Sequence, residues 1–239
     1  MTLDIRTRLA DNLASVRARI MTAAAKSSRS ADAVRLVAVT KYVDTQLAQL
    51  LVDLGCHDLG ESRPQELWHK SETVVASGSQ SVRWHMIGHL QRNKLARSLP
   101  VIALVHSGDS MRLLTTIDSI GREQNRRIAT LVEVNVSGDA TKHGFTPAEL
   151  PALGEPLKSL THVDIHGLMA MAGREGDLDS ARREFAELRQ LRDRLRSIWP
   201  AEVALDELSM GMSGDFDVAI EEGATIVRVG SALFDGLEI

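Results

Sequence analysis

The sequence predicts an α/β fold in which eight parallel strands, each followed by a helix, close into a (β/α)8 barrel of the TIM type. Short apolar runs alternate with helical patterns along the chain, which is typical of parallel strands joined by crossover helices. Eight such units fill 239 residues, and this length suits one barrel domain over residues 1–239. An open doubly wound sheet is the alternative, but it usually has a glycine-rich turn after its first strand, where this chain has Thr40-Lys41-Tyr42.

An additional helix is expected at the N-terminus, before the first strand. Apolar residues recur there at intervals of three and four, so they share one helix face. These residues are Ile5, Leu9, Leu13, Val16 and Ile20. The polar segment 26–32 then connects this helix to the barrel.

Eight apolar runs have the length and composition of buried strands. They are Leu36–Lys41, His57–Ser62, Arg83–Gly88, Ala103–Ser107, Thr130–Val136, Asp164–Met171, Glu207–Met212 and Ile226–Phe234. A leucine stripe between the first two runs ends at Gly55, which predicts a helix there. Pro64 suits the first position of the next helix. A long amphipathic helix after the sixth run is expected to end before Pro200.

Composition excludes several classes of protein. The net charge of −4, from 28 basic and 32 acidic residues, does not suit a nucleic-acid-binding face. The single cysteine, Cys56, excludes an internal disulfide and a cysteine-rich zinc site and suits a reducing compartment. No uncharged apolar run approaches the roughly 18 residues of a membrane-spanning helix. Acidic Asp4 and Asp11 do not suit a secretory signal, so we expect a cytoplasmic protein with no membrane partner.

Lys41 ends the first predicted strand at the carboxyl end of the barrel, where the active sites of such barrels lie. A partly buried amine at a strand end is favoured in its neutral, nucleophilic form. Such an amine can form a Schiff base with an aldehyde. The alternative is a solvated lysine that begins a loop.

Two loops of small residues follow the seventh and eighth strands. The first runs from Ser209 to Asp215 and precedes a helical pattern, and the second is Arg228-Val229-Gly230-Ser231. Glycines let backbone N–H groups approach a ligand, hydroxyls add donors, and a helix N-terminus favours an anion. Phosphate sites in barrels frequently occupy these two loops. The alternative is that both loops are ordinary tight turns.

Arg228 interrupts the last apolar strand. Strand alternation places its side chain opposite to those of Val227 and Val229, so it points into the barrel if the valines face the helices. An unpaired charge there would be costly. Arg228 therefore needs a carboxylate, a phosphate or a ring nitrogen, and a structural ion pair with Glu133 or Glu207 is as plausible as a ligand contact.

Other side chains are weaker candidates. His85 lies on the third strand, and the sequence alone favours a hydrogen-bonded core histidine over a residue that lines the site. Three methionines near strand ends are more often packing residues. They are Met169, Met210 and Met212. His162 and His166 are four residues apart on a strand, which does not suit the helical zinc pattern, and we predict no metal site.

A lysine amine, a pair of phosphate-binding loops and an arginine inside the barrel together favour pyridoxal 5'-phosphate (PLP) as the cofactor. PLP brings an aldehyde, a phosphate and a ring nitrogen, and each of these features of the chain suits one of them. A Schiff-base aldolase that acts on a phosphorylated sugar is the alternative, and it would use two of the three.

Longer motifs resemble those of the pyridoxal phosphate homeostasis proteins. The most specific are the stretches 84–94 (WHMIGHLQRNK) and 208–215 (LSMGMSGD). Supporting stretches are Ala38-Val39-Thr40-Lys41, Gly60-Glu61 with Gln65-Glu66, Val134-Asn135 with Lys142-His143-Gly144, Gly167-Leu168-Met169, and Val227-Arg228-Val229-Gly230-Ser231. The resemblance runs from about Leu36 to Phe234. It implies a PLP-binding barrel of fold type III, similar to the N-terminal domain of alanine racemase, and a role in PLP homeostasis.

The resemblance also implies roles for individual residues. Lys41 would form the covalent aldimine with PLP, and Arg228 would face the pyridine nitrogen. The phosphate would be held by Ser213, Gly230 and Ser231. The cofactor pocket would be lined by His85, Met169, Ser209 and Met210. The family usually has Asn after Gly-Glu, whereas Ser62 stands there in this chain, so a contact made by that Asn would pass through water.

Two functions are consistent with the resemblance. One is a monomeric carrier that holds PLP and supplies PLP-dependent apoenzymes, and the other is an amino-acid racemase-like PLP enzyme. Racemisation needs a proton donor and a proton acceptor on opposite faces of the cofactor, but the only tyrosine, Tyr42, is adjacent to Lys41. An arginine beside the pyridine nitrogen also disfavours its protonation, which makes the ring a poorer electron sink. We therefore expect a carrier without catalytic turnover.

Overall fold

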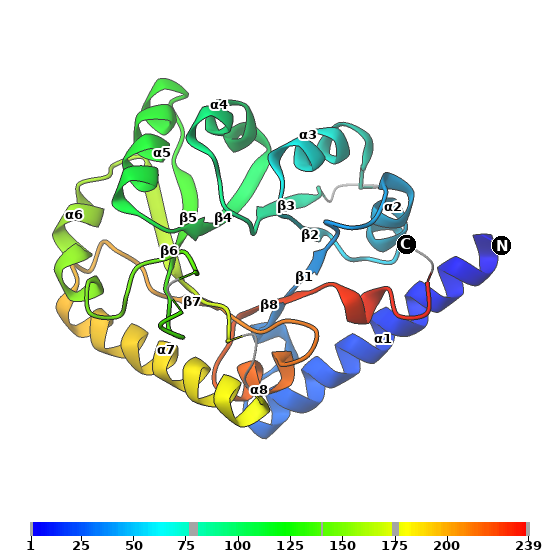
Figure 1. The fold of residues 1–239 in the computed structure, drawn as a ribbon. Helices are drawn as coiled ribbons and strands as arrows, with labels where there is room; N and C mark the ends of the chain where they lie inside the picture. The colour runs from blue at the N-terminus through cyan, green and yellow to red at the C-terminus, as the bar shows by residue number, and fades with distance from the viewer. Residues whose placement is uncertain (1, 77–80, 140, 174–176, 238–239) are drawn as a thin grey trace.

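Eight parallel strands form a closed barrel in the computed structural model of this protein, which describes residues 2–76, 81–139, 141–173 and 177–237 (Figure 1). The strands are β1 (Arg35–Val39), β2 (Asp58–Glu61), β3 (Arg83–Met86), β4 (Ile102–Gly108), β5 (Ile128–Glu133), β6 (Val163–Met169), β7 (Glu207–Ser209) and β8 (Ile226–Val229). Each strand pairs with the next along the chain, and β8 pairs with β1 to close the barrel. The predicted barrel is therefore confirmed, and the open sheet is excluded.

Helices surround the barrel on its outside (Figure 1). They are α1 (Thr2–Lys26), α2 (Thr45–Asp53), α3 (Pro64–Thr73), α4 (Leu95–Ser98), α5 (Met111–Glu123), α6 (Gly154–Lys158), α7 (Leu178–Ile198) and α8 (Phe216–Glu221). The expected N-terminal helix, the proline at the start of α3 and the end of α7 before Pro200 are confirmed. Among the described helices, none has a stretch long and apolar enough to cross a membrane.

The long helix α1 packs beside α8 and the segment that follows β8 (Figure 1). Its Arg19 forms an ion pair with Asp217 of α8. The Asn12 amide donates hydrogen bonds to the carbonyl oxygens of Leu233 and Asp235, at 3.0 and 2.9 Å. The N-terminal helix therefore braces the last βα unit of the barrel.

Seven of the eight predicted strands end one to five residues earlier than expected, the fourth being the exception, and the seventh and eighth bear most on the site. The seventh ends at Ser209 instead of Met212, because Gly211 turns the chain with a φ of +92°. A side chain at Gly211 would also lie within 2.6 Å of the Ala219 side chain. The eighth ends at Val229 instead of Phe234, because the chain leaves the sheet at Gly230 and forms a 3-10 turn over Ser231–Leu233. Both corrections place small-residue loops at the carboxyl end of the barrel.

The core has two parts that lie on opposite faces of the barrel wall. The larger cluster fills the space between strands and helices and includes Val227 and Val229. The smaller apolar cluster contains Val37, Leu104, Leu131, Met169 and Ile226. Val37, Ile226 and Arg228 alternate with residues of the larger cluster on their strands, so they point into the barrel. The valines of β8 thus face outward and Arg228 faces inward, as its alternation predicts.

Replacing Gly167 by Ala is expected to destabilise the barrel. Gly167 of β6 pairs with Glu207 of β7, and a Cβ at this position would lie 1.9 Å from the Glu207 carbonyl oxygen. Because that oxygen belongs to a neighbouring strand, the two strands would have to move apart. We expect the free energy of unfolding, measured by urea titration, to fall by about 3 kcal/mol or more. Gly214→Ala is the control, since nothing lies within 4 Å of its Cβ position; equal stability of the two variants would contradict this account of the β6–β7 pairing.

Candidate functional site

The candidate site lies at the carboxyl ends of β1, β7 and β8. Pairing of β1 with β8 brings residues from opposite ends of the sequence together, with Val37 opposite Arg228 and Ala38 opposite Val229. A Cβ placed on Gly230 would lie 3.4 Å from the Val39 side chain. The turn that carries Lys41 therefore adjoins the loop that follows Arg228.

Lys41 lies in a turn closed by a 3.1 Å hydrogen bond from the Val43 N–H to the Thr40 carbonyl oxygen. The side chain of Lys41 is half-buried, and its Nζ is 4.8 Å from the centroid of the Tyr42 ring. Tyr42 itself is 71% exposed. The tyrosine thus lies on the same side as the lysine and does not face it across a pocket.

A buried ion pair fixes the backbone just before Lys41. Lys70 of α3 donates from its Nζ to the Thr40 carbonyl oxygen at 2.6 Å and to Glu61 at 2.7 Å. The Thr40 hydroxyl donates to the same Glu61 oxygen at 2.6 Å. Both charged side chains are almost completely buried, so loss of either would leave the other charge uncompensated. This arrangement holds the end of β1 against β2 and α3.

The two loops proposed for phosphate are tied to each other. The Ser213 hydroxyl accepts hydrogen bonds from the backbone N–H groups of Gly230 and Ala232, at 3.1 and 3.3 Å. Ser213 and Ser231 line a pocket of about 420 Å³ that α1 also borders. The helix after the first loop, α8, has only six residues, so its dipole would add little to anion binding. A bound anion would be held mainly by hydrogen bonds from hydroxyls and backbone N–H groups of the two loops.

Arg228 is buried inside the barrel and its guanidinium has two fixed partners. It donates to the Ser209 hydroxyl and, at 2.9 Å, to the Ala170 carbonyl oxygen. Burial lowers the pKa of Arg228 to about 10, although Glu133 and Asp215 act in the opposite direction. Its guanidinium therefore stays charged at neutral pH. In the part of the chain that the structure describes, Arg228 forms no ion pair with Glu133 or Glu207, and Glu207 pairs with Arg35 instead.

A chain of hydrogen bonds continues from Arg228 across the barrel interior. His106 Nδ1 lies 2.9 Å from the Ser209 Oγ, and His106 Nε2 lies 2.9 Å from His85 Nδ1. His85 Nε2 in turn lies 2.9 Å from a carboxylate oxygen of Asp58. Asp58 also forms an ion pair with Arg83 at the amino end of the barrel. Five side chains thus connect the candidate site with the opposite end of the barrel.

The order of donors along this chain follows from its two ends. Arg228 can only donate, so the Ser209 hydroxyl accepts from it. Ionised Asp58 can only accept, so each neutral histidine carries its proton on Nε2, and His106 Nδ1 accepts the Ser209 proton. His106 then donates from Nε2 to His85 Nδ1, and His85 donates from Nε2 to Asp58. Every proton therefore points from the candidate site toward Asp58.

His85 and His106, the two histidines of this series of hydrogen bonds, are neutral at physiological pH. Burial lowers the pKa of His85, although Asp58 opposes the shift. Burial lowers the pKa of His106 well below its usual value, and the nearby His85 and Arg228 act in the same direction. Burial disfavours ionisation of Asp58, but hydrogen bonds from His85 and Arg83 hold the pKa of its carboxyl well below the usual range.

The structure distributes the other predicted site residues over three positions. Met169 and Ser209 lie in the barrel interior, and half-buried Ser62 follows β2 directly. His85 lies deeper than a pocket-lining residue, in the hydrogen-bonded chain that includes His106. The Met210 side chain packs in the outer cluster between strands and helices. Asp58 and His106 were not predicted from the sequence, because their role depends on which residues meet inside the barrel.

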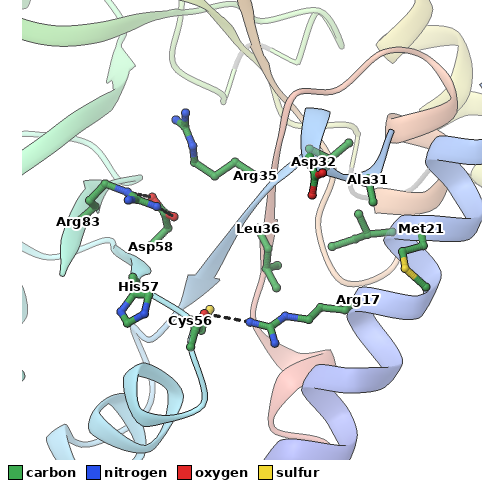
Figure 2. A pocket seen from close by; sticks show the side chains of 13 residues that line it. Arg17, Met21, Ala31, Asp32, Arg35, Leu36, Cys56, His57, Asp58 and Arg83 are labelled. Atoms are coloured by element: carbon green, nitrogen blue, oxygen red, sulfur yellow. Dashed lines mark hydrogen bonds and ion pairs between the residues drawn. The ribbon is translucent and has the colours of Figure 1, made fainter. Parts of the chain in front are cut away.

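A separate pocket of about 550 Å³ opens at the amino ends of β1 to β3 (Figure 2). Lys41 follows the carboxyl end of β1, so it lies at the opposite end of the barrel. The three arginines of the pocket have partners within the chain. Arg83 pairs with Asp58, Arg35 with Glu207, and Arg17 donates to the Gly55 carbonyl oxygen at 3.0 Å. Because ligand sites of such barrels lie at the carboxyl ends of the strands, we place the functional site there.

Comparison with known proteins connects this geometry with a family. The family model of the alanine racemase N-terminal domain matches residues 11–237. A pyridoxal phosphate homeostasis protein from Aquifex aeolicus is 38% identical over 94% of this chain and 96% of the relative. This chain belongs to the pyridoxal phosphate homeostasis protein family.

Solved structures agree with this assignment. PipY of Synechococcus elongatus, solved with PLP bound, has a TM-score of 0.83 and 32% identity, and the match covers 95% of this chain and 99% of PipY. An alanine racemase from Clostridium difficile has a TM-score of 0.73 at 16% identity, and the match covers 95% of this chain but 56% of the racemase. The racemase comparison shows a shared barrel fold and nothing further.

The neutral histidines predict a specific dependence of stability on pH. Below about pH 6.5 the unfolded chain takes up a proton at His85 and at His106, whereas the lowered pKa values of both histidines shift this uptake to lower pH in the folded protein. Stability is therefore complete above pH 6.5 and is lost as pH falls, by up to about 1.4 kcal/mol per pH unit for each histidine. The double variant His85→Gln, His106→Gln should show a shallower loss of unfolding free energy between pH 6.5 and 5, measured by urea titration at each pH.

The variants must be compared with wild type because Glu133 changes the stability of the protein with pH in the opposite direction to the two histidines. Burial and Asp109 raise the pKa of Glu133 to about 7, so its contribution to stability is lost as pH rises from about 4.5 toward 7. Exposed His69 provides the control, and His69→Gln should keep the wild-type pH dependence. An unchanged slope in the double variant would show that His85 and His106 are not held neutral.

Proposed function

We propose that this protein binds PLP at the carboxyl ends of β1, β7 and β8 and takes part in PLP homeostasis. Two comparisons support the proposal: the relatives carry that name, and PipY was solved with PLP bound. The observation that carries it is the pairing of β1 with β8, which sets the Lys41 turn beside Gly230 and Arg228. An amine, an anion-binding loop pair and a fixed cation thus adjoin one another.

Each chemical group of PLP has a suitable partner in the proposed site. We propose that the Lys41 amine condenses with the aldehyde of PLP to form a Schiff base, with release of one water molecule. The phosphate would be held by Ser213, Gly230 and Ser231, where the Ser213 hydroxyl already joins the two loops. Arg228 would face the ring nitrogen, and Met169 and Ser62 would border the ring. Met210 would line the pocket with its backbone, because its side chain packs outside the barrel. His85 would not touch PLP, but would support Arg228 through His106 and Ser209.

The charge on Arg228 favours a carrier over an enzyme. Because Arg228 stays charged at neutral pH, a proton on an adjacent ring nitrogen would place two positive charges together. An unprotonated ring withdraws electrons weakly from a substrate carbanion. Tyr42, the only tyrosine, lies beside Lys41 and is exposed, so it does not supply a proton donor on the opposite face.

The proposed carrier holds PLP reversibly and releases it. Keeping PLP bound limits the free concentration of a reactive aldehyde, and release supplies PLP-dependent apoenzymes, which are the proposed protein partners. We propose that it does so as a monomer in the cytoplasm and without catalytic turnover.

Reduction with borohydride tests the covalent attachment. Addition of PLP to the protein should produce the near-visible absorbance of a PLP Schiff base, and reduction followed by peptide mass mapping should place the adduct on Lys41. Lys41→Ala should lose both signals, while Lys158→Ala, which changes a lysine paired with Glu202 on the surface, should keep them. An adduct that persists in Lys41→Ala would overturn the proposed attachment site.

Exchange of an amino-acid α-proton with solvent tests the absence of turnover. We expect the PLP-loaded protein to exchange the α-proton of alanine in deuterated water no faster than free PLP does, because Tyr42 is exposed beside Lys41 and supplies no second base across the cofactor. The measurement is NMR loss of the α-proton signal. Rapid exchange that requires Lys41 would support the racemase-like alternative instead.

A further inference from the structure

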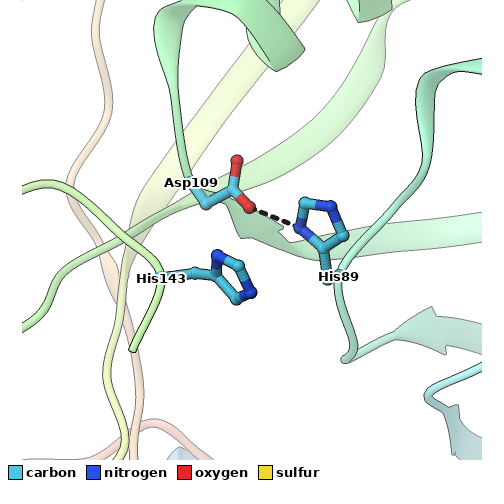
Figure 3. A group of neighbouring side chains, drawn as sticks. All are labelled: His89, Asp109 and His143. Carbon is cyan, nitrogen blue, oxygen red and sulfur yellow. Dashed lines mark hydrogen bonds and ion pairs between the residues drawn. The ribbon is translucent and has the colours of Figure 1, made fainter. Parts of the chain in front are cut away.

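Three loops at the carboxyl end of the barrel bring together two histidines and an aspartate (Figure 3). His89 follows β3, Asp109 follows β4, and His143 lies in the segment after β5. One potential ligand atom from each residue lies within 4.8 Å of the other two. We propose that these residues, the His89–Asp109–His143 triad, form a binding site for a divalent transition metal ion, with zinc as the best fit.

The distances suit a metal ion after a small closure. Zinc binds histidine nitrogens at about 2.0–2.1 Å in a tetrahedral arrangement, which sets neighbouring ligand atoms roughly 3.3 Å apart. His89 Nδ1 already lies 2.8 Å from an Asp109 carboxylate oxygen. The His89 and His143 rings are stacked with centroids 4.7 Å apart and planes inclined by 19°. Both histidines are exposed, so rotation of their side chains can complete the closure without movement of the strands.

The chemistry of the donors selects the class of metal. Two imidazoles and one carboxylate suit zinc and its neighbours in the first transition row, whereas magnesium and calcium require oxygen ligands. Three protein ligands leave a further coordination position open for water. Two of the three residues, His89 and Asp109, line a cleft of about 420 Å³ that Arg92 and Arg112 also border, so there is space for that ligand.

The charge of Asp109 supports the same conclusion. Its side chain is 7% exposed, and His89 is its ion-pair partner. Within the described ranges of the chain, no lysine or arginine forms an ion pair with Asp109. A buried carboxylate that has no lysine or arginine partner has its negative charge available to a metal ion.

This proposal replaces the expectation of no metal site. That expectation rested on spacing along one element, and the triad combines residues from three separate loops. It also differs from the histidine–carboxylate pair His166–Asp164, where the atoms are 3.2 Å apart but no third ligand is grouped with them among the described residues.

Isothermal titration of the PLP-free protein with zinc chloride tests the site independently of PLP binding. Wild type should bind one zinc ion, and His143→Ala and Asp109→Asn should each bind it at least about tenfold more weakly. Cobalt(II) should give visible absorption bands typical of low coordination number in wild type and lose them in both variants. His166→Ala is the matched control and should bind zinc as wild type does.

The outcomes separate the proposal from surface binding. His143 is exposed, so its replacement is expected to leave the fold intact, and circular dichroism checks this. Weak zinc uptake that is unchanged in His143→Ala and Asp109→Asn, or an equal loss in His166→Ala, would overturn the proposed site. A failure of PLP binding would leave the result unaffected, because the titration uses protein without PLP.

Discussion

The buried guanidinium of Arg228 is the constraint on which the barrel interior depends. A charged group inside a closed barrel is stable only when fixed partners accept its hydrogen bonds. Ser209 and the Ala170 carbonyl oxygen accept hydrogen bonds from Arg228. The buried Ser209 hydroxyl in turn needs a partner, which is His106, and His106 is hydrogen-bonded to His85. The chain of hydrogen bonds ends at the ionised Asp58 and so satisfies every buried polar group along it. Hydrogen bonds therefore link this one arginine of β8 to side chains on β7, β4, β3 and β2.

Barrel closure supplies the proximity that the sequence lacks. Lys41 and Gly230 come from the first and last strands, and they are neighbours only because β8 pairs with β1. Two sets of interactions then hold the loops on either side of the β1–β8 pairing. Lys70 and Glu61 fix the turn before Lys41, and the Ser213 hydroxyl joins the loops after β7 and β8. The proposed PLP site is thus a property of the closed barrel and of no single loop.

The sequence predicted those features that depend on local patterns. Strand alternation placed Arg228 inside the barrel, and strand–helix alternation gave the architecture. The ends of β7 and β8 were wrong because Gly211 and Gly230 turn the chain while apolar residues continue beyond them. The partners of His85 were not predictable, since they depend on the register of β3 against its neighbours β2 and β4. The His89–Asp109–His143 grouping was missed for the same reason.

The donor order in the barrel bears on the difference between holding PLP and using it. Each proton from Arg228 to Asp58 points away from the candidate site, so the chain of hydrogen bonds delivers none to a group that faces Arg228. To protonate a ring nitrogen, Arg228 would have to give up a proton, and a pKa of about 10 prevents this near neutrality. The ring nitrogen in the proposed site would then act only as an acceptor. The hydrogen bonds that stabilise the barrel interior therefore also keep the ring nitrogen unprotonated and limit electron withdrawal by the cofactor. Weak electron withdrawal suits a carrier, whereas an enzyme that forms a carbanion would have to overcome it.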